Sequence, residues 1–214
     1  MNWKIWVCVP VLYGLFSLWY FNWQGPLTEE EIENVMQGFD EQKETSNTDK
    51  AMFRKFLEED DGDEFVMLNQ VELIKGSVRH PVLGEAKSAS DILNDYFGPF
   101  SVALLSRGGH PVFQANTVGG NVDSWNADTN QSFELTAMMR YKSRRDIAEL
   151  FLDPVMVDAH RYKIAAIERT VSYPTRVEVS SSLRPPVAFA LILLLVASLA
   201  QNWQFALVRR EGDR

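Results

Sequence analysis

The run Val187–Val208 (VAFALILLLVASLAQNWQFALV) constrains this chain more than any other stretch. Its first fourteen residues carry no charge and only one hydroxyl group, that of Ser198. Twenty-two residues in a helix extend about 33 Å, which is enough to cross the hydrocarbon core of a bilayer. Because a helix satisfies its own backbone hydrogen bonds in lipid, the run predicts a C-terminal transmembrane helix over residues 187–208.

A second apolar run, Ile5–Trp23, follows Lys4. It is longer than the apolar centre of a typical cleaved signal peptide and does not end on small residues, so it favours an uncleaved signal anchor. Aromatic residues stand near the ends of both runs, as they do in the interfacial belts of membrane helices. We expect membrane-interface positions at Trp3, Trp6, Trp19, Tyr20, Trp23 and Trp203.

Basic residues flank the two runs on one side. Lys4 precedes the first run, and Arg209, Arg210 and Arg214 follow the second. Short flanks rich in Lys and Arg stay in the cytoplasm. We therefore expect an inner (plasma) membrane protein with both termini cytoplasmic. Residues 24–184 would then be extracytoplasmic, which in a Gram-negative cell means periplasmic.

The apolar runs and the changes in composition between them predict the domain organisation. We expect a signal anchor over 1–24, an acidic helical arm over 25–63, an α+β domain over 64–179, a linker over 180–186, a transmembrane helix over 187–208 and a cytoplasmic tail over 209–214.

The predicted arm is strongly acidic. Residues 29–64 hold fourteen acidic and four basic side chains, a net charge of −10. The chain shows no basic stripe, which argues against a nucleic-acid-binding protein. The acidic run is either a solvated helical face or a docking surface for a basic partner, and both interpretations remain open. Thr28 and Glu31 form a capping box before one helical pattern, and Lys50–Glu59 carries another.

From Glu64 the periodicity changes to that of strands. The pattern predicts a strand over 64–75, a loop over 76–86, a helix from Ser88 or Ser90 to about Arg107, strands over 110–119 and 131–142, a helix over 143–151, a partly helical segment over 155–166 and a last strand over 169–179. The order strand, helix, strand, strand, helix, strand predicts an α+β, ferredoxin-like domain with a split βαβ antiparallel sheet.

The third predicted strand alternates between apolar and polar residues. Its apolar set should face the helices, leaving the other side chains on the open face of the sheet. We expect Glu134, Thr136 and Arg140 on that open face, together with Gln114 and Asn116 of the preceding strand. A ligand pocket, if present, would be lined by this group with Asn69 and Tyr96; the alternative is an exposed or dimer-facing hydrogen-bond network.

Several motifs resemble the DUF1330-like group of dimeric α+β barrel proteins. They are Phe65-Val66-Met67-Leu68-Asn69, Gly108-Gly109-x-Pro-Val-Phe, Arg140-Tyr141-x-Ser143-Arg144, and Asp153-Pro154 followed by His160-Arg161. The likeness covers roughly residues 50–175. It implies a ferredoxin-like domain whose open sheet face packs on a second copy. The wider superfamily includes small monooxygenases, isomerases and haem enzymes. This chain departs from the group in its apolar run at each end.

The candidate catalytic residues are His160, Arg140 and Glu134. Histidine titrates near neutrality and suits acid/base chemistry. The pattern around His160 favours a structural role instead, in which it caps a helix end or pairs with a nearby carboxylate such as Asp158. His80, His110 and His160 are spaced too widely for a metal signature, and the only cysteine, Cys8, lies in the first apolar run. The sequence contains no Gly-rich phosphate loop that opens a helix. We expect no metal and no cofactor.

Two functions follow from these patterns. The first is an accessory or structural subunit, or an assembly partner, of a membrane complex; its partners would be the bilayer and either another membrane protein or further copies of itself. The second is a membrane-tethered small-molecule-binding protein or enzyme, of monooxygenase or isomerase type, that uses the open sheet face.

Overall fold

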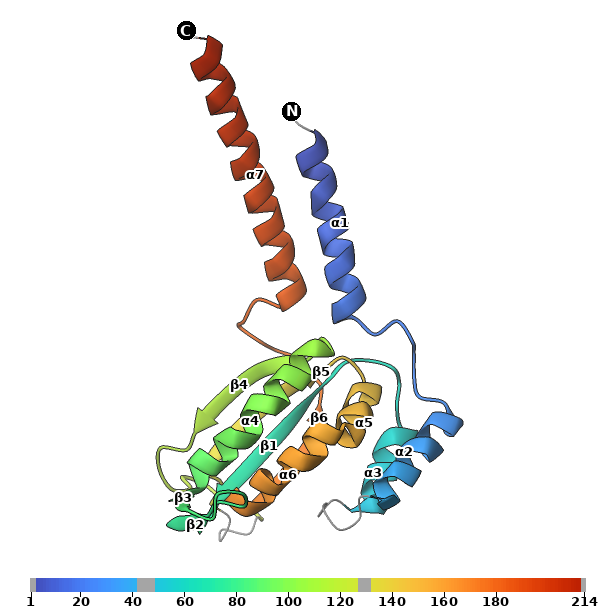
Figure 1. Cartoon of the computed structure of the whole chain (residues 1–214), viewed down its shortest axis with the longest axis vertical. Helices are drawn as coiled ribbons and strands as arrows, with labels where there is room; N and C mark the ends of the chain where they lie inside the picture. Colours follow the sequence, from blue (N-terminus) through green and yellow to red (C-terminus); the bar gives the residue numbers. More distant parts are fainter. Residues whose placement is uncertain (1–2, 42–48, 127–131, 213–214) are drawn as a thin grey trace. The chain divides into compact units, whose positions relative to one another are not determined.

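The structure, a computed structural model, describes residues 3–41, 49–126 and 132–212. It divides into two compact units (Figure 1). One unit is formed by Asn22–Val177, and the other by the chain on either side of it. Each unit is considered by itself below.

The terminal unit consists of two long apolar helices. Helix α1 covers Trp3–Tyr20 and helix α7 covers Pro185–Gly212. The mean hydropathy of an 18-residue window is 1.2 in Trp3–Tyr20 and 1.8 within Pro185–Val208. By length and composition, both helices could cross a membrane. Helix α7 extends through Gly212, into the stretch where a separate tail is expected.

Helices α1 and α7 run antiparallel and pack on each other (Figure 1). The rings of Phe16 and Phe189 stack with their centroids 4.4 Å apart. Buried side chains of these helices include Tyr20 of α1 and both Ala197 and Gln201 of α7. The less exposed positions recur every three or four residues, which gives each helix one packed face. The remaining face of α7 is aliphatic and exposed.

The aromatic residues expected at membrane interfaces lie in or beside these helices. Trp3 and Trp19 are exposed on α1, Trp203 is exposed on α7, and Trp6 is partly buried. Tyr20 is only 3% exposed, because it packs against Phe16. Trp23 lies beyond the end of α1. Their placement in a bilayer interface stays a prediction.

The larger unit contains a four-stranded antiparallel sheet with strand order β4-β5-β1-β6. The strands are β1 (Phe65–Leu73), β4 (His110–Asn116), β5 (Leu135–Tyr141) and β6 (Ile167–Thr175). Strand β1 lies between β5 and β6, which agrees with its nearly continuous apolar sequence. The mixed α+β class and the antiparallel sheet are as predicted.

Helices α4 (Ala89–Ser106), α5 (Arg144–Leu152) and α6 (Pro154–Ala166) lie over one face of this sheet (Figure 1). One core cluster joins Leu104 and Met156 of these helices to Ala137, Met139 and Tyr141 of β5. A second cluster contains Val71, Ile92, Leu93, Leu135 and Ala166. The apolar residues that the alternation places on the helix side are buried at Leu135, Ala137, Met139 and Tyr141. Phe133, the first of that set, lies before β5 and is half-buried.

The predicted helix starts agree with the observed caps. The Asp91 N–H donates to Ser88 Oγ at 3.1 Å, which makes Ser88 the N-cap of α4. Thr28 and Glu31 form the expected reciprocal box, with Thr28 N–H donating to Glu31 Oε2 at 2.8 Å. The segment expected to be partly helical is a complete helix, because the side chain of Asp153 caps α6 and Pro154 occupies its first turn.

The region expected to be a plain loop, residues 76–86, instead contains part of a small hairpin. Strands β2 (Ser77–Arg79) and β3 (Ala86–Ser88) pair antiparallel. Each strand has three residues, too few for an alternating pattern to be visible in the sequence. Val78 packs on the second core cluster, and this contact attaches the hairpin to the domain.

The acidic arm packs on the domain. It consists of α2 (Glu29–Glu41) and α3 (Lys50–Glu58). Apolar side chains of both helices form a third core cluster with Ala148 of α5, and the ring of Phe39 stacks on that of Phe151 with centroids 5.0 Å apart. Residues 42–48, which connect the two helices in the sequence, lie outside the described residues.

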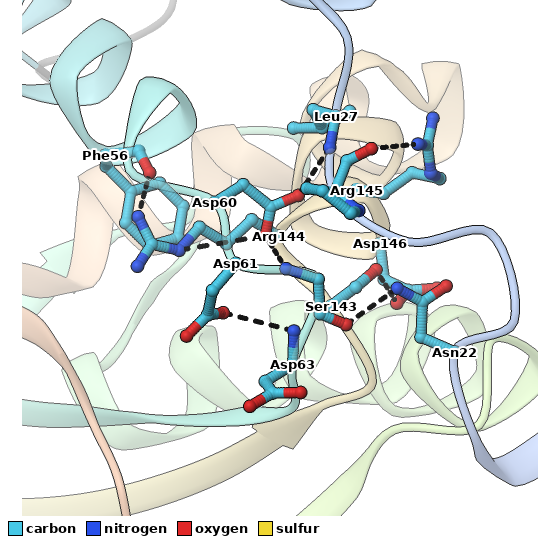
Figure 2. A network of polar contacts seen from close by, with 12 residues as sticks. Asn22, Leu27, Phe56, Asp60, Asp61, Asp63, Ser143, Arg144, Arg145 and Asp146 are labelled. Carbon is cyan, nitrogen blue, oxygen red and sulfur yellow. Dashed lines mark hydrogen bonds and ion pairs between the residues drawn. The ribbon is translucent and has the colours of Figure 1, made fainter.

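A polar network joins the arm to the start of α5 (Figure 2). The side chain of Asp60 is 1% exposed and accepts N–H groups from Leu27 at 2.8 Å and Gly62 at 3.2 Å. Arg144 Nε lies 3.9 Å from the same carboxylate, and Arg144 also donates to the carbonyl of Phe56. The buried carboxylate therefore connects three segments that are distant in sequence.

Arg145 makes a second connection between the arm and α5. Its guanidinium pairs with the carboxylate of Glu31 at the start of α2. The hydrogen bond from Arg145 is the main cause that lowers the pKa of Glu31 from 4.5 to about 2. The acidic start of α2 is thus stabilised by a basic residue of the α+β domain.

Candidate functional site

The sheet face opposite α4, α5 and α6 carries no other helix among the described residues of this unit. An apolar row crosses that face over all four strands. Phe113 is paired with Met138, Met138 with Leu68, and Leu68 with Tyr173. Phe113 is 50% exposed and Tyr173 is 44% exposed, while the two central side chains are half-buried. We call these four residues the apolar row.

The neighbouring positions on this face are smaller or polar. On one side of the row, the register aligns Ala115, Thr136, Gln70 and Val171. On the other side it aligns His110, Arg140, Val66 and Thr175. Thr136 and Arg140 therefore lie on the face that the alternation predicted.

Arg140 is held by contacts within the domain. Its side chain is buried, and both Nε and Nη2 donate to Glu64 Oε2, at 2.9 and 2.6 Å. Nη1 donates to the carbonyl of Gly108 at 2.7 Å. This arrangement connects β5 to the residue before β1 and to the turn between α4 and β4. The guanidinium thus serves to stabilise the end of the sheet.

Glu134 also contacts backbone. The Leu73 N–H donates to Glu134 Oε2 at 3.3 Å, where the pairing of β1 and β6 is irregular. The carboxylate satisfies an amide group next to this irregularity. Arg140 lies opposite Val66 near the start of β1, whereas Glu134 contacts the amide group of Leu73 at the end of β1. These two candidate catalytic groups therefore lie at opposite ends of the sheet.

The predicted placement of Gln114 and Asn116 is wrong. Gln114 is paired with Ala137 and Asn116 with Leu135, so both share the helix-facing side of the sheet. The reason is a bulge. From Pro111 to Phe113 strand β4 advances by two residues, while the paired strand β5 advances by one, from Met139 to Met138. The extra residue reverses the alternation for the rest of β4.

Asn69 and Tyr96 are not on the open face either. Asn69 is paired with Ala137, and its Oδ1 accepts the hydroxyl of Ser172 at 2.7 Å. Tyr96 belongs to α4 and packs against both core clusters on the helix side. Burial raises the pKa of its hydroxyl well above the ordinary value. Neither side chain can line a pocket on the opposite face.

His160 lies on α6, which covers the helix side of the sheet. Burial, followed by the nearby charge of Lys163, lowers the pKa of His160 from 6.5 to about 4. Burial also lowers the pKa of Lys163. Asp158 pairs with Arg161 at 2.7 Å, so it is not the expected partner of His160. The sheet lies between His160 and the open-face residue Arg140.

A groove that the sequence did not indicate lies on the helix side of the domain. It has a volume of about 660 Å³ and lies between the β2–β3 turn, α4 and α6. Its apolar wall includes Val82, Leu83, Pro99, Val155 and Tyr162. Its charged side chains are Lys87, Asp95 and Asp158. We call this hollow the helix-side groove.

His80 is built into the wall of this groove. It is 4% exposed, and its Nδ1 accepts N–H groups from Val82 at 3.2 Å and Leu83 at 3.0 Å. The proton of the neutral ring is therefore on Nε2, which lies 3.0 Å from Asp95 Oδ2. With both ring nitrogens engaged, His80 holds the carboxylate of Asp95 in place. Only the spacing of the histidines was visible in the sequence.

Among the residues that the structure describes, no three His, Cys, Asp or Glu side chains gather in a way that could hold a metal ion. The candidate residues for acid/base chemistry are dispersed over both faces of the sheet. Two features of the described residues have the form of a binding surface, the apolar row and the helix-side groove.

Comparisons with known proteins identify relatives of the fold only. No protein-family model matches the chain, that of DUF1330 included, and no curated protein does. The crystal structure of RPA0582, a protein of unknown function from Rhodopseudomonas palustris, is similar over 65% of this chain and 97% of its own, with 20% identity and a TM-score of 0.50. Methylated RPA0582 gives 65% and 95% coverage, 21% identity and a TM-score of 0.51. These matches support the α+β fold.

Proposed function

We propose that this protein is a membrane-anchored, non-catalytic assembly subunit whose domain binds a second copy of itself through the open face of its sheet. The observation that carries the proposal is the apolar row, which crosses four strands without interruption. Large apolar side chains exposed on a sheet face favour burial against a partner.

The geometry of the row suits a twofold dimer. Phe113 lies at the β4 edge and Tyr173 at the β6 edge, so a twofold axis that lies between two facing sheets and runs along the strands places Phe113 of one copy over Tyr173 of its partner. Met138 and Leu68 would occupy the centre. Two copies of such a self-complementary patch bury each other, so no other protein is required to cover it.

The strand order supports the finer fold assignment. With β1 and β5 central and β4 and β6 at the edges, the sheet has the order of a split βαβ, ferredoxin-like domain. The resemblance to dimeric α+β barrel proteins implies the same mode of sheet-to-sheet packing. Membership of the DUF1330-like group is part of this proposal.

The terminal helices support membrane attachment. Both are long and apolar enough to cross a bilayer, and Lys4, Arg209 and Arg210 favour cytoplasmic termini. The domain would then be extracytoplasmic and confined to a thin layer at the inner membrane. Confinement raises the effective concentration of one copy for another, so a modest interface suffices for pairing.

The alternative, an enzyme that uses the same face, has less support. Arg140 and Glu134 are engaged by the backbone and by Glu64, and His160 belongs to the opposite side of the sheet. General acid–base catalysis needs these groups within reach of one substrate. The observed placement instead favours a structural role for each of them.

The mass of the full-length protein in detergent micelles or lipid nanodiscs tests the proposal. We expect a dimer for the wild type and a monomer for Leu68→Asp, because the new charge would be buried at the centre of the interface. Val102→Asp is the matched control, because Val102 is 70% exposed on α4 and lies on the helix side. Circular dichroism checks that both variants are folded.

A monomeric wild type at all accessible concentrations would overturn the proposal. A dimeric Leu68→Asp variant would also overturn it, since the contact would then lie elsewhere. Dissociation caused by Val102→Asp would place the interface on the helix side.

A further inference from the structure

We propose that the helix-side groove binds a small zwitterion with an apolar body, such as a free α-amino acid with an aromatic or branched side chain. This site is on the opposite side of the domain from the apolar row, so the inference goes beyond the proposed assembly role. It rests on the charges of Lys87 and Asp95 and on the wall around them.

The groove presents one positive and one negative group that are available to a ligand. Among the described residues, the side chain of Lys87 makes no ion pair, and the side chain of Asp95 has a hydrogen bond or ion pair with His80 alone. Asp158, the third charged residue of the lining, is already paired with Arg161 at 2.7 Å. An ammonium group therefore fits Asp95, and a carboxylate fits Lys87.

Asp95 is positioned for this role by His80. The two backbone N–H groups on Nδ1 fix the orientation of the buried ring and place the proton on Nε2, next to Asp95 Oδ2. The side chain of Asp95 nevertheless remains 46% exposed, so Oδ1 is left to accept from a ligand. A carboxylate held by a buried partner loses little freedom when it binds a cation.

The apolar wall of the groove would contact the apolar side chain of the ligand. Val82 and Leu83 on the β2–β3 turn are 52% and 56% exposed, and Val155 on α6 is 59% exposed. The ring of Tyr162 completes the lining. The volume of about 660 Å³ lies in the usual range for small-molecule sites and leaves room for a side chain of this type.

Titration of the full-length protein in lipid nanodiscs, followed by isothermal calorimetry, tests the inference. L-phenylalanine is the probe. N-acetyl-L-phenylalanine lacks the ammonium charge, and 2-phenylethylamine lacks the carboxylate. We expect saturable binding of L-phenylalanine and at least about tenfold weaker binding of each analogue, because each loses one charge-assisted hydrogen bond.

Variants assign the two charges. Asp95→Asn and Lys87→Gln should each weaken L-phenylalanine binding by about tenfold or more. Glu85→Gln is the matched control; it removes an exposed carboxylate of the β2–β3 turn that does not line the groove, and we expect a change below about twofold. Lys87→Gln removes no ion pair between described residues, so it remains informative even if Asp95→Asn disturbs His80 and the fold.

Failure to bind L-phenylalanine at about 10 mM would overturn the inference, because that concentration exceeds the dissociation constant of even a very weak site. Equal affinity for L-phenylalanine and its acetylated form would overturn the role of Asp95. Unchanged binding by both Asp95→Asn and Lys87→Gln would show that the ligand lies elsewhere.

Discussion

Gly109 lies directly against the backbone of Arg140. A Cβ atom at position 109 would be 2.7 Å from the Arg140 carbonyl oxygen, and it would also overlap the side chain of Leu104. Gly109 follows the end of α4, where its N–H donates to the Leu104 carbonyl at 3.0 Å. Only glycine allows the turn from α4 into β4 to pass this close to β5.

We expect Gly109→Ala to destabilise the domain by about 2 kcal/mol, because the overlap is with backbone that cannot rotate away. Thermal unfolding of the full-length protein in detergent micelles measures the loss. Gly119→Ala is the control, because a Cβ atom there would meet nothing within 4 Å. Equal melting temperatures for the two variants would contradict the close approach.

The ion pair between Arg140 and Glu64 predicts a second stability effect. Glu64→Gln should destabilise the domain by about 2 kcal/mol, because it removes the negative charge that pairs with the buried guanidinium of Arg140 at 2.6 Å. Lys55→Gln is the control, since Lys55 is 75% exposed and lies 3.8 Å from Glu59, which is also exposed; its loss should cost below about 0.5 kcal/mol. Denaturant unfolding measures the free energy of unfolding of both variants. A loss for Glu64→Gln as small as that of the control would contradict a stabilising role for the Arg140–Glu64 ion pair.

These examples show what the sequence could and could not reveal. The order of strands and helices followed from periodicity and from the caps at Ser88 and Thr28, which are local signals. The face occupied by Gln114 depended on a bulge in β4, and a single extra residue leaves no pattern in a seven-residue strand. The pairing of Arg140 with Glu64 spans 76 residues, so no local rule could identify it.

The groove was missed for a related reason. His80 and Asp95 are fifteen residues apart, on a hairpin turn and a helix, and they meet only because the β2–β3 hairpin folds back over α4. The hairpin itself was too short to predict. A buried histidine can be recognised from its contacts, but it has no signature in a chain with three scattered histidines.

His160 predicts a dependence of stability on pH. Its pKa is lowered to about 4 in the folded chain by burial and by Lys163, whereas in the unfolded chain it is near 6.5. The unfolded state therefore takes up the proton first as the pH falls. The stability associated with neutral His160 is complete above pH 6.5 and is lost progressively between pH 6.5 and 4.

We expect His160→Gln to lose less stability than the wild type when the pH falls through this window, by up to about 2 kcal/mol. Thermal midpoints between pH 7.5 and 4 measure the difference. His110→Gln is the matched control, since its ring lies on the other side of the sheet at the start of β4. Parallel pH profiles for the wild type and His160→Gln would contradict the prediction.

The contact between Phe16 and Phe189 predicts where α1 and α7 can be cross-linked. In a Cys8→Ser background, Phe16→Cys with Phe189→Cys should form a disulfide on mild oxidation, because the parent rings stack at 4.4 Å. Leu15→Cys with Leu191→Cys should not, because both leucines are exposed on other faces of their helices. Mobility on non-reducing gels is the measurement. Equal cross-linking of both pairs would show that the helices do not hold this register.

The central position of β1 has a consequence for the order in which the protein can be built. Its two neighbours are β5 and β6, and β6 ends at Thr175, more than a hundred residues after β1 begins. At about 5–20 residues per second, synthesis leaves β1 without its last neighbour for roughly 6–20 s. During that interval an apolar strand must be shielded by something other than its own sheet. Only nine residues separate β6 from α7, so the domain closes just as the second apolar helix emerges.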